Sequence, residues 1–280
     1  MAKRGVYIAY KKNGEKYYRA SFTYRNKHIS LGSFKTEKKA ADAYAFACRI
    51  IDDRSCTLEM LEKKMPISYD KYVTIINFRD NNIYLPNPIY VRKKYISYYI
   101  SETEEMKFSI DDLFYYMSHR ILRRGGHFYV NDYGMQLSLG NRYGIKNYAV
   151  KGKDFRFVNS DDLDYRYENI EILNTYHGVE NCIYRKKNCY KAKIHVIGDY
   201  VIGYYEDAIK AAIAYNKAID ILKRNGIKKE YSANYIESIS GKTYADIYSE
   251  LKISKALMSL KGDRLKLYLK ICIMIKHIII

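Results

Sequence analysis

Two stretches of this 280-residue chain share one order of small, aromatic and glycine residues, and this internal repeat constrains the fold more than any other feature. The first reads YYRASFTYRNKHISLGSFKTEKKAADAYAFA from residue 17, and the second reads CYKAKIHVIGDYVIGYYEDAIKAAIAYNKA from residue 189. Ala20 matches Ala192 at an offset of 172, whereas Tyr44 matches Tyr215 at 171, so one residue is lost in between. The repeat predicts two copies of one small folding unit.

The pattern within each copy predicts three antiparallel strands backed by one helix, and therefore an α+β chain. In the first copy, residues 17–24 and 28–34 alternate and are rich in β-formers, with a turn expected at Asn26-Lys27 and a short strand at 5–10 before them. Thr36 is expected to cap a helix whose alanines let it lie close to the sheet.

Strand parity divides each sheet into a face that packs on the helix and an open face. Ala20 and Phe22 are expected to pack on the helix. The candidate nucleic-acid-binding residues are then Tyr7, Arg19, Ser21, Thr23, Arg25 and His28 in the first copy, and Tyr184, Lys191, Lys193 and His195 in the second. Basic groups would neutralise phosphates, and the tyrosines would stack or pack on sugar. A solvated polar face is the alternative, but it does not explain the repeated positive sign.

The net charge is concentrated in the repeats. The chain carries a formal charge of +18, of which residues 1–50 hold +9, 51–180 hold −1, 181–230 hold +6 and 231–280 hold +4. Such a distribution favours a polyanion as partner, most simply duplex DNA, over a uniformly solubilised surface.

Both copies resemble the AP2 (AP2/ERF) DNA-binding domain. The first copy carries Tyr18-x-Ala20-x-Phe22, Leu31-Gly32-x-Phe34, Thr36-Glu37 and Ala40-Ala41-x-Ala43-Tyr44 at the positions of that family's core. The resemblance implies DNA binding by the sheet. Plant members use Trp and several Arg on that face, whereas this chain has no Trp and places Ser21, Thr23 and Ser30 there, so base specificity is not carried over.

The segment before the second copy, DFRFVNSDDLDYRYENIEIL, resembles the end of the catalytic motif of HNH homing endonucleases of phage and bacteria. That family's metal-binding Asp falls on Arg156, its general-base His on Phe157, and its Asn on Tyr165. Neither Arg156 nor Phe157 can do the chemistry of the residue it replaces. The resemblance thus implies a degenerate HNH-like domain with no catalytic residues and no cofactor. His119, His127 and the acids Asp161, Asp162 and Asp164 are candidates for a displaced Mg²⁺-dependent site, with surface histidines and an acidic turn as the alternative.

These observations divide the chain into an AP2-like module at 1–55, a central domain at 56–180, a second module at 181–230 and a helical segment at 231–280. Within the centre, 83–100 suggests strands, and 110–122 is expected to be a helix that starts after Ser109 and stops at Gly125-Gly126. The apolar end, ICIMIKHIII, is too short to cross a bilayer and is expected to be a buried helix or strand.

The cysteines and the N-terminus give two further expectations. His177, Cys182, Cys189 and His195 match no common zinc spacing, which favours buried or free thiols. The opening MAKRGVYIAYKKNG has no apolar signal core, which predicts the cytoplasm of the host cell and no membrane partner.

Three functions compete at this point. The first is a phage-encoded DNA-binding protein derived from a homing endonuclease that no longer cleaves. The second is a nuclease with a displaced site. The third is a counter-defence protein that inhibits a host immune complex, which the neutral, tyrosine-rich middle would favour by offering an aromatic surface to a protein partner.

Overall fold

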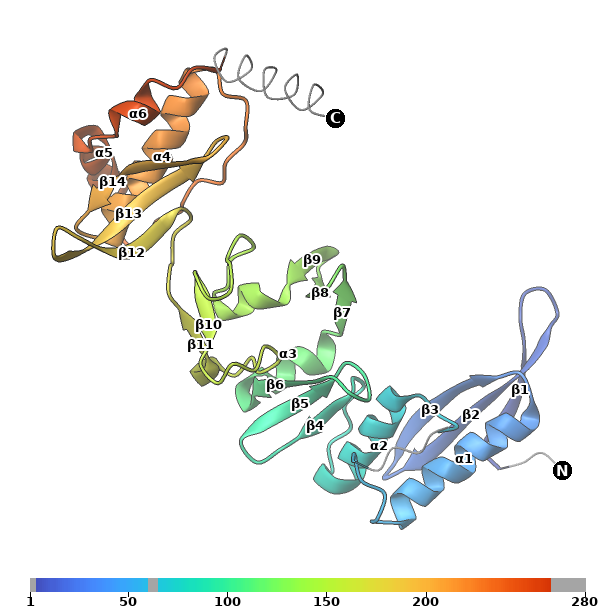
Figure 1. The fold of residues 1–280 in the computed structure, drawn as a ribbon. Coiled ribbons are helices and arrows are strands. Elements are labelled where there is room, and N and C mark those ends of the chain that lie inside the picture. Colours follow the sequence, from blue (N-terminus) through green and yellow to red (C-terminus); the bar gives the residue numbers. More distant parts are fainter. Residues whose placement is uncertain (1–3, 60–64, 263–280) are drawn as a thin grey trace, which may run out of the picture. The chain divides into compact units, whose positions relative to one another are not determined.

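The computed structural model describes residues 4–59 and 65–262 and is an α+β fold with small antiparallel sheets (Figure 1). The described chain forms two compact units. The first comprises residues up to Gly144 together with Phe157–Ile170, and the second comprises Ile145–Arg156 together with the residues from Glu171. This division differs from the four predicted segments, because the helix after residue 55 shares a core with the first module.

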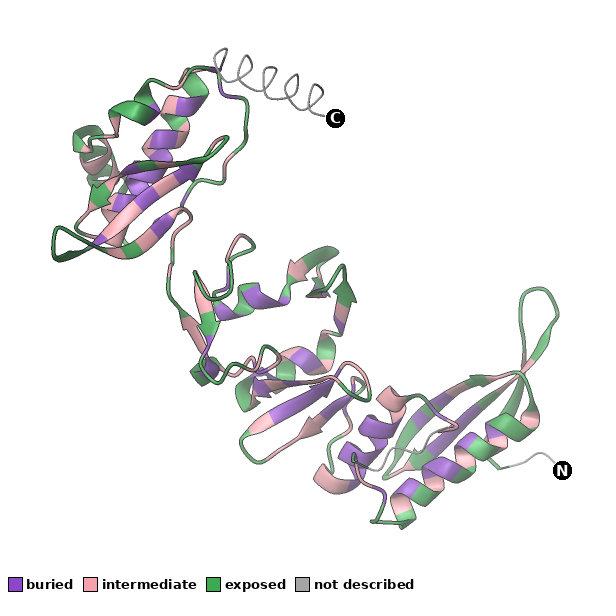
Figure 2. Ribbon diagram, in the orientation of Figure 1, coloured by how far each residue is buried: buried purple, intermediate pink, exposed green. Residues whose placement is uncertain are grey.

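The first repeat folds as predicted into three antiparallel strands and a helix. Its elements are β1 (Val6–Tyr10), β2 (Lys16–Tyr24), β3 (Lys27–Phe34) and α1 (Glu37–Asp52). Thr36 caps α1, because its hydroxyl accepts a hydrogen bond from the Lys39 N–H at 3.3 Å. Ala20 and Phe22 are 1% and 6% exposed in the core with α1, which confirms the predicted parity. Figure 2 shows buried stretches both on α1 and on the strands of its sheet.

The predicted turn of this module is wrong by one residue. Arg25 and Asn26 have φ values of +44° and +62°, and Tyr24 pairs with Lys27. Two consecutive left-handed residues form the two-residue hairpin turn that matches strand twist. Arg25 therefore lies in the turn and not on the open face of the sheet.

The second repeat has the same architecture in the second unit. Its elements are β12 (Val179–Tyr184), β13 (Lys187–His195), β14 (Asp199–Tyr205) and α4 (Ala208–Arg224). Asp207 takes the place of Thr36, since its carboxylate accepts from the Lys210 N–H at 2.7 Å.

The two sheets agree in register as well as in order. A row of Val6, Ala20 and Gly32 crosses the first sheet, and Val179, Ala192 and Gly203 cross the second. In each sheet the register shifts directly after this alanine, where one residue of the third strand, Leu31 or Ile202, has no partner on the central strand. The lost residue lies in the next turn, where four residues separate the pair Thr23–His28 and three separate His195–Asp199. The structure thus confirms the internal repeat.

A glycine before the first strand of each module passes directly against an aromatic ring. Gly5 has φ +75°, and a Cβ there would lie 2.0 Å from the Tyr44 ring. Gly178 has φ +71°, and a Cβ there would lie 2.3 Å from the Tyr215 ring. Both positions therefore require glycine for conformation and for space.

We expect Gly5→Ala to lower the free energy of unfolding by about 1–3 kcal/mol more than Gly14→Ala does, measured by urea denaturation. Gly14 has φ +80° with no atom within 4 Å of a built Cβ, so it reports backbone strain alone. Equal losses in the two variants would show that the Tyr44 contact is unimportant.

The rest of the first unit contains two helices and two further three-stranded sheets. Helix α2 (Tyr69–Asn81) shares the core of α1, and β4–β5–β6 and β7–β8–β9 are antiparallel. The remaining elements of this unit are β4 (Ile89–Val91), β5 (Tyr95–Tyr99), β6 (Glu105–Ser109), α3 (Leu113–Ser118), β7 (Ile121–Arg124), β8 (His127–Asp132), β9 (Met135–Ser138), and 3₁₀ turns at Ile110–Asp112, Leu139–Tyr143 and Tyr167–Asn169.

The expected helix over 110–122 is wrong beyond Ser118. The chain enters β7 instead, and Gly125-Gly126, with φ of +56° and +82°, forms a two-residue hairpin turn between Arg124 and His127. Two glycines in the left-handed region suit this turn as well as they suit a helix end.

Several tyrosines of the middle region belong to the core, whereas others, such as Tyr133 at 97% exposed, lie on the surface. Five of the tyrosines are 7% exposed or less: Tyr72, Tyr98, Tyr99, Tyr116 and Tyr143. The Tyr116 and Tyr143 hydroxyls lie 2.8 Å apart in this core. The middle region thus has both buried and exposed aromatic rings, and the protein partner stays a prediction.

The second unit packs two short helices, α5 (Gly241–Glu250) and α6 (Lys255–Met258), around α4. Two short strands, β10 (Phe155–Phe157) and β11 (Ile170–Ile172), form a two-stranded sheet where the chain passes between the units. The expected buried tail at 271–280 lies outside the described residues. Among the described helices, none has both the length and the apolar character needed to cross a membrane.

Candidate nucleic-acid interface

The open face of the first sheet brings five of the six predicted residues of this module together. Tyr7 pairs with Arg19 across β1 and β2, and Thr23 pairs with His28 across β2 and β3. All four side chains are exposed, and Tyr7 is 57% exposed. A hollow of about 360 Å³ opens on this face, lined by Tyr7, Arg19, Ala20, Ser21, His28 and Ser30.

Ser21 differs from its neighbours because it directly follows the register shift between β2 and β3. Its N–H donates to the Gly5 carbonyl at 3.0 Å, and the residue is only 7% exposed. It lines the hollow without standing out from the sheet.

Arg19 is the charge that this face offers to a ligand. Among the described residues it has no ion-pair partner. Its side chain is exposed on the central strand, between Tyr7 of β1 and Ser33 of β3. Arg25, by contrast, donates from its guanidinium to the Asn82 side chain and lies 5.4 Å from the Tyr24 ring centre. Of the two predicted arginines, only Arg19 is available on the sheet face.

A second hollow, of about 560 Å³, was not anticipated from the sequence. It lies at the β1–β2 hairpin end of the sheet and is lined by Lys11, Glu15, Lys16, Tyr17, Ser33, Phe34 and Lys35. One of its lysines is paired, since Lys11 Nζ lies 2.8 Å from Glu15. In the sequence, the signal that could have predicted this hollow is the group of lysines that flanks Asn13-Gly14.

The lysines on the open face of the second sheet are paired with its own acids. Glu180 occupies the position of Tyr7, and its carboxylate lies 2.7 Å from Lys193, 3.1 Å from Lys191 and 3.0 Å from Lys153. Burial acts to raise the pKa of Glu180, but the hydrogen bonds from the three lysines outweigh it and lower this pKa to about 2. Lys191 and Lys193 therefore lie on the predicted face with their charge already partnered.

The other two predicted residues of the second module are also engaged. His195 Nδ1 lies 2.8 Å from the Asp199 carboxylate, and this hydrogen bond is the main cause that lowers the pKa of Asp199. Tyr184 stacks on Tyr204 with ring centres 4.0 Å apart, so one ring face is covered. The second sheet offers a ligand less free charge than the first.

The free cations of the second module lie at its β12–β13 hairpin instead. Arg185, Lys186 and Lys187 are exposed and have no ion-pair partner in the described part of the chain. Arg185 lies 5.2 Å from the Tyr184 ring centre. The Arg-Lys-Lys run was visible in the sequence, but its place at a hairpin tip depends on the register of the strands.

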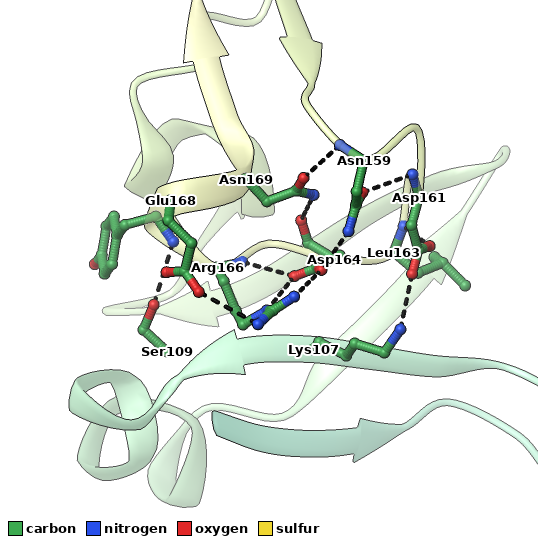
Figure 3. Close-up of polar contacts among 10 residues, drawn as sticks. Lys107, Ser109, Asn159, Asp161, Leu163, Asp164, Arg166, Glu168 and Asn169 are labelled. Atoms are coloured by element: carbon green, nitrogen blue, oxygen red, sulfur yellow. Dashed lines mark hydrogen bonds and ion pairs between the residues drawn. The ribbon is translucent and has the colours of Figure 1, made fainter. Parts of the chain in front are cut away.

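The acids of the central motif are used to fold their own loop (Figure 3). Asp164 is fully buried and accepts two hydrogen bonds from the Arg166 guanidinium, at 2.8 Å and 2.6 Å. Asn159 donates to the same carboxylate at 2.8 Å. Asp161 accepts from Lys107 of β6 at 2.9 Å and from the Leu163 N–H at 3.1 Å. Asp161 and Asp164 therefore have structural partners.

The positions that the HNH resemblance assigns to catalytic groups carry structural side chains. Phe157 is 7% exposed and packs edge-on against Tyr165, whose ring also contacts Tyr143. Arg156 forms an ion pair with Glu171 at 2.6 Å. Neither an aromatic core residue nor a paired arginine can activate water.

The two candidate histidines for a displaced catalytic site, His119 and His127, lie in different surroundings. His119 stacks on Tyr115 at 4.1 Å and lies 3.4 Å from Asp132, whereas His127 is exposed at the end of a hairpin. Within residues 4–59 and 65–262, no three His, Cys, Asp or Glu side chains come together in a way that suits a metal ion.

Comparisons with known proteins give no relative: no family model matches the chain, and neither a curated protein nor a solved structure matches it.

Proposed function

We propose that this chain binds duplex DNA through the open face of its first sheet. The observation that carries the proposal is Arg19, an exposed cation without an ion-pair partner among the described residues, beside Tyr7 and above a hollow in a three-stranded sheet. A guanidinium binds phosphate or guanine through two parallel hydrogen bonds, and sheets of this size enter a major groove. The likeness of both repeats to AP2 domains supports the same reading.

The proposal gives the second module a lesser and different role. The lysines of its sheet face are already in ion pairs with Glu180, so its contribution to binding comes from the exposed hairpin cations Arg185, Lys186 and Lys187. Those side chains would contact phosphates and add salt-sensitive affinity without sequence preference.

The proposal includes no cleavage. Phe157 and Arg156 stand where the HNH resemblance would place the base and the metal ligand, and Asp164 is committed to Arg166. The chain is thus proposed to hold DNA and not to hydrolyse it.

We expect Arg19→Glu to weaken duplex binding about tenfold or more at moderate salt, and to reduce the slope of log K against log salt by about 1. The reason is that it replaces the free cation of the face with an anion. The measurement is fluorescence anisotropy with a labelled duplex of mixed sequence across a salt series.

Lys191→Glu is the matched control, because it makes nearly the same charge change at the equivalent position of the second sheet, where Glu180 already partners the lysine. We expect a smaller loss there. Equal losses would assign the effect to total charge, and no loss for Arg19→Glu would exclude the first sheet as the interface.

A further inference from the structure

Two cysteines face each other across the first two strands of the second module. Cys182 of β12 pairs in register with Cys189 of β13, and their Sγ atoms lie 3.2 Å apart as free thiols. The turn between the strands consists of Arg185 and Lys186, which both have positive φ.

This pairing places the cysteines at a distance that a disulfide can span. Tyr184 and Lys187 close the two-residue turn as a hydrogen-bonded pair, and pair types alternate along an antiparallel ladder, so Cys182 and Cys189 form the next hydrogen-bonded pair. Such pairs have Cα atoms about 5.5 Å apart, which lies inside the range for disulfides.

The thiols lie on the open face of the sheet and not in the core beneath it. Val179 and Ala192 point to α4, and parity places Cys182 with Glu180 on the opposite side. Neither cysteine belongs to the cluster of apolar side chains that the sheet and α4 bury between them. Cys182 is partly exposed, whereas Cys189 is 9% exposed. A reagent therefore meets Cys182 first.

The first module lacks this feature. Ala9 and Tyr17 form the equivalent cross-strand pair there, so the fold of the repeat does not require thiols at these positions.

We propose that Cys182 and Cys189 form a dithiol site that reacts with low-molecular-weight disulfides and closes to a cross-strand disulfide. The Cys182 thiolate attacks one sulfur of the small disulfide, and the other half leaves as a thiolate. Cys189, deprotonated in turn, attacks the Cys182 sulfur and releases the second half, so two thiols of the protein are oxidised while one small disulfide is reduced to two thiols. The site adjoins Lys191 and Tyr184 of the face discussed above, but its chemistry does not depend on DNA binding.

Oxidised glutathione with the folded, reduced full-length chain is the test. Burial and the hydrogen bond with Cys189 raise the pKa of Cys182, so the incubation uses mildly alkaline buffer to populate the thiolate. Trypsin cuts at Arg185, Lys186 and Lys187, which separates the cysteines onto peptides 167–185 and 188–191. We expect these two peptides to be joined by a reducible bond, with no glutathione retained on either.

Single variants test the order of the two steps. Cys189→Ser should hold glutathione on Cys182 as a stable mixed disulfide, because the second thiol is absent. Cys182→Ser should react much more slowly, because Cys189 is nearly buried. Circular dichroism checks that both variants fold.

Cys48 and Cys56 provide the internal control, since both lie in the first unit and neither is in a disulfide. Joined peptides that contain Cys48 or Cys56 in place of the expected pair would overturn the proposal. Glutathione retained on Cys182 in the unaltered chain would overturn it as well, as would reaction of the pair only after unfolding in urea.

Discussion

Asp164→Asn is expected to lower the free energy of unfolding of the first unit by about 3–5 kcal/mol, because it removes one partner of a buried ion pair. Asp164 is fully buried, and Arg166 binds both of its carboxylate oxygens. The amide has one acceptor where the carboxylate had two, so the guanidinium and the Asn159 amide lose partners. Urea denaturation followed by circular dichroism measures the loss.

Asp111→Asn is the matched control, since Asp111 is exposed at the start of a 3₁₀ turn and makes the same chemical change. We expect its effect to stay within about 0.5 kcal/mol. A loss for Asp164→Asn no larger than that of Asp111→Asn would contradict the structural role assigned to this acid.

The same carboxylate gives the stability of this unit a pH dependence with a defined sign. Burial acts to raise the pKa of Asp164, but the hydrogen bonds from Arg166 and Asn159 outweigh it and hold this pKa below the ordinary 3.8. A depressed folded pKa contributes stability that is present above the unfolded value and is lost as pH falls through the folded one. Asp164→Asn should therefore remove part of the acid sensitivity below about pH 4.

The three-stranded sheet and helix of each repeat, and the sheet face that packs on the helix, could be predicted from the sequence. Strand parity and the spacing of small residues are local properties. Ala20 and Phe22 pack on the helix as their alternation predicts, and Thr36 caps that helix. The local sequence could not show whether Gly125-Gly126 ends a helix or forms a hairpin turn, because glycines with positive φ do both. Pairing of β7 with β8, a tertiary outcome, selected the hairpin.

The charge of the two faces could not be predicted from parity alone. Counting basic residues makes the faces look alike, because Arg19 and Lys191 occupy the same place. The difference comes from their cross-strand neighbours, which are Tyr7 in one sheet and Glu180 in the other. Which lysines are free of ion pairs therefore depends on strand register, which places Glu180 beside Lys191. Lys153, from a segment outside the sheet, also pairs with this carboxylate.

This difference leads to a gain of function. We expect Glu180→Gln to strengthen duplex binding about tenfold at about 0.1 M salt and to steepen the salt dependence, because each lysine that gains a phosphate contact adds about 0.9 to the slope. The reason is that one carboxylate holds Lys153, Lys191 and Lys193. With its pKa near 2, Glu180 is ionised throughout the neutral range, so the lysines are not released by a modest fall in pH.

Glu206→Gln makes the same change in net charge at an exposed ion pair with Lys210, beside the start of α4 and off the strands that carry the face. Anisotropy titrations over a salt series compare both variants with the unaltered chain. A gain confined to Glu180→Gln means that the second sheet has the geometry to bind DNA and is held back by its own acid. An equal gain in Glu206→Gln would mean that only net charge matters, and no gain in either would show that the freed lysines do not reach the phosphates.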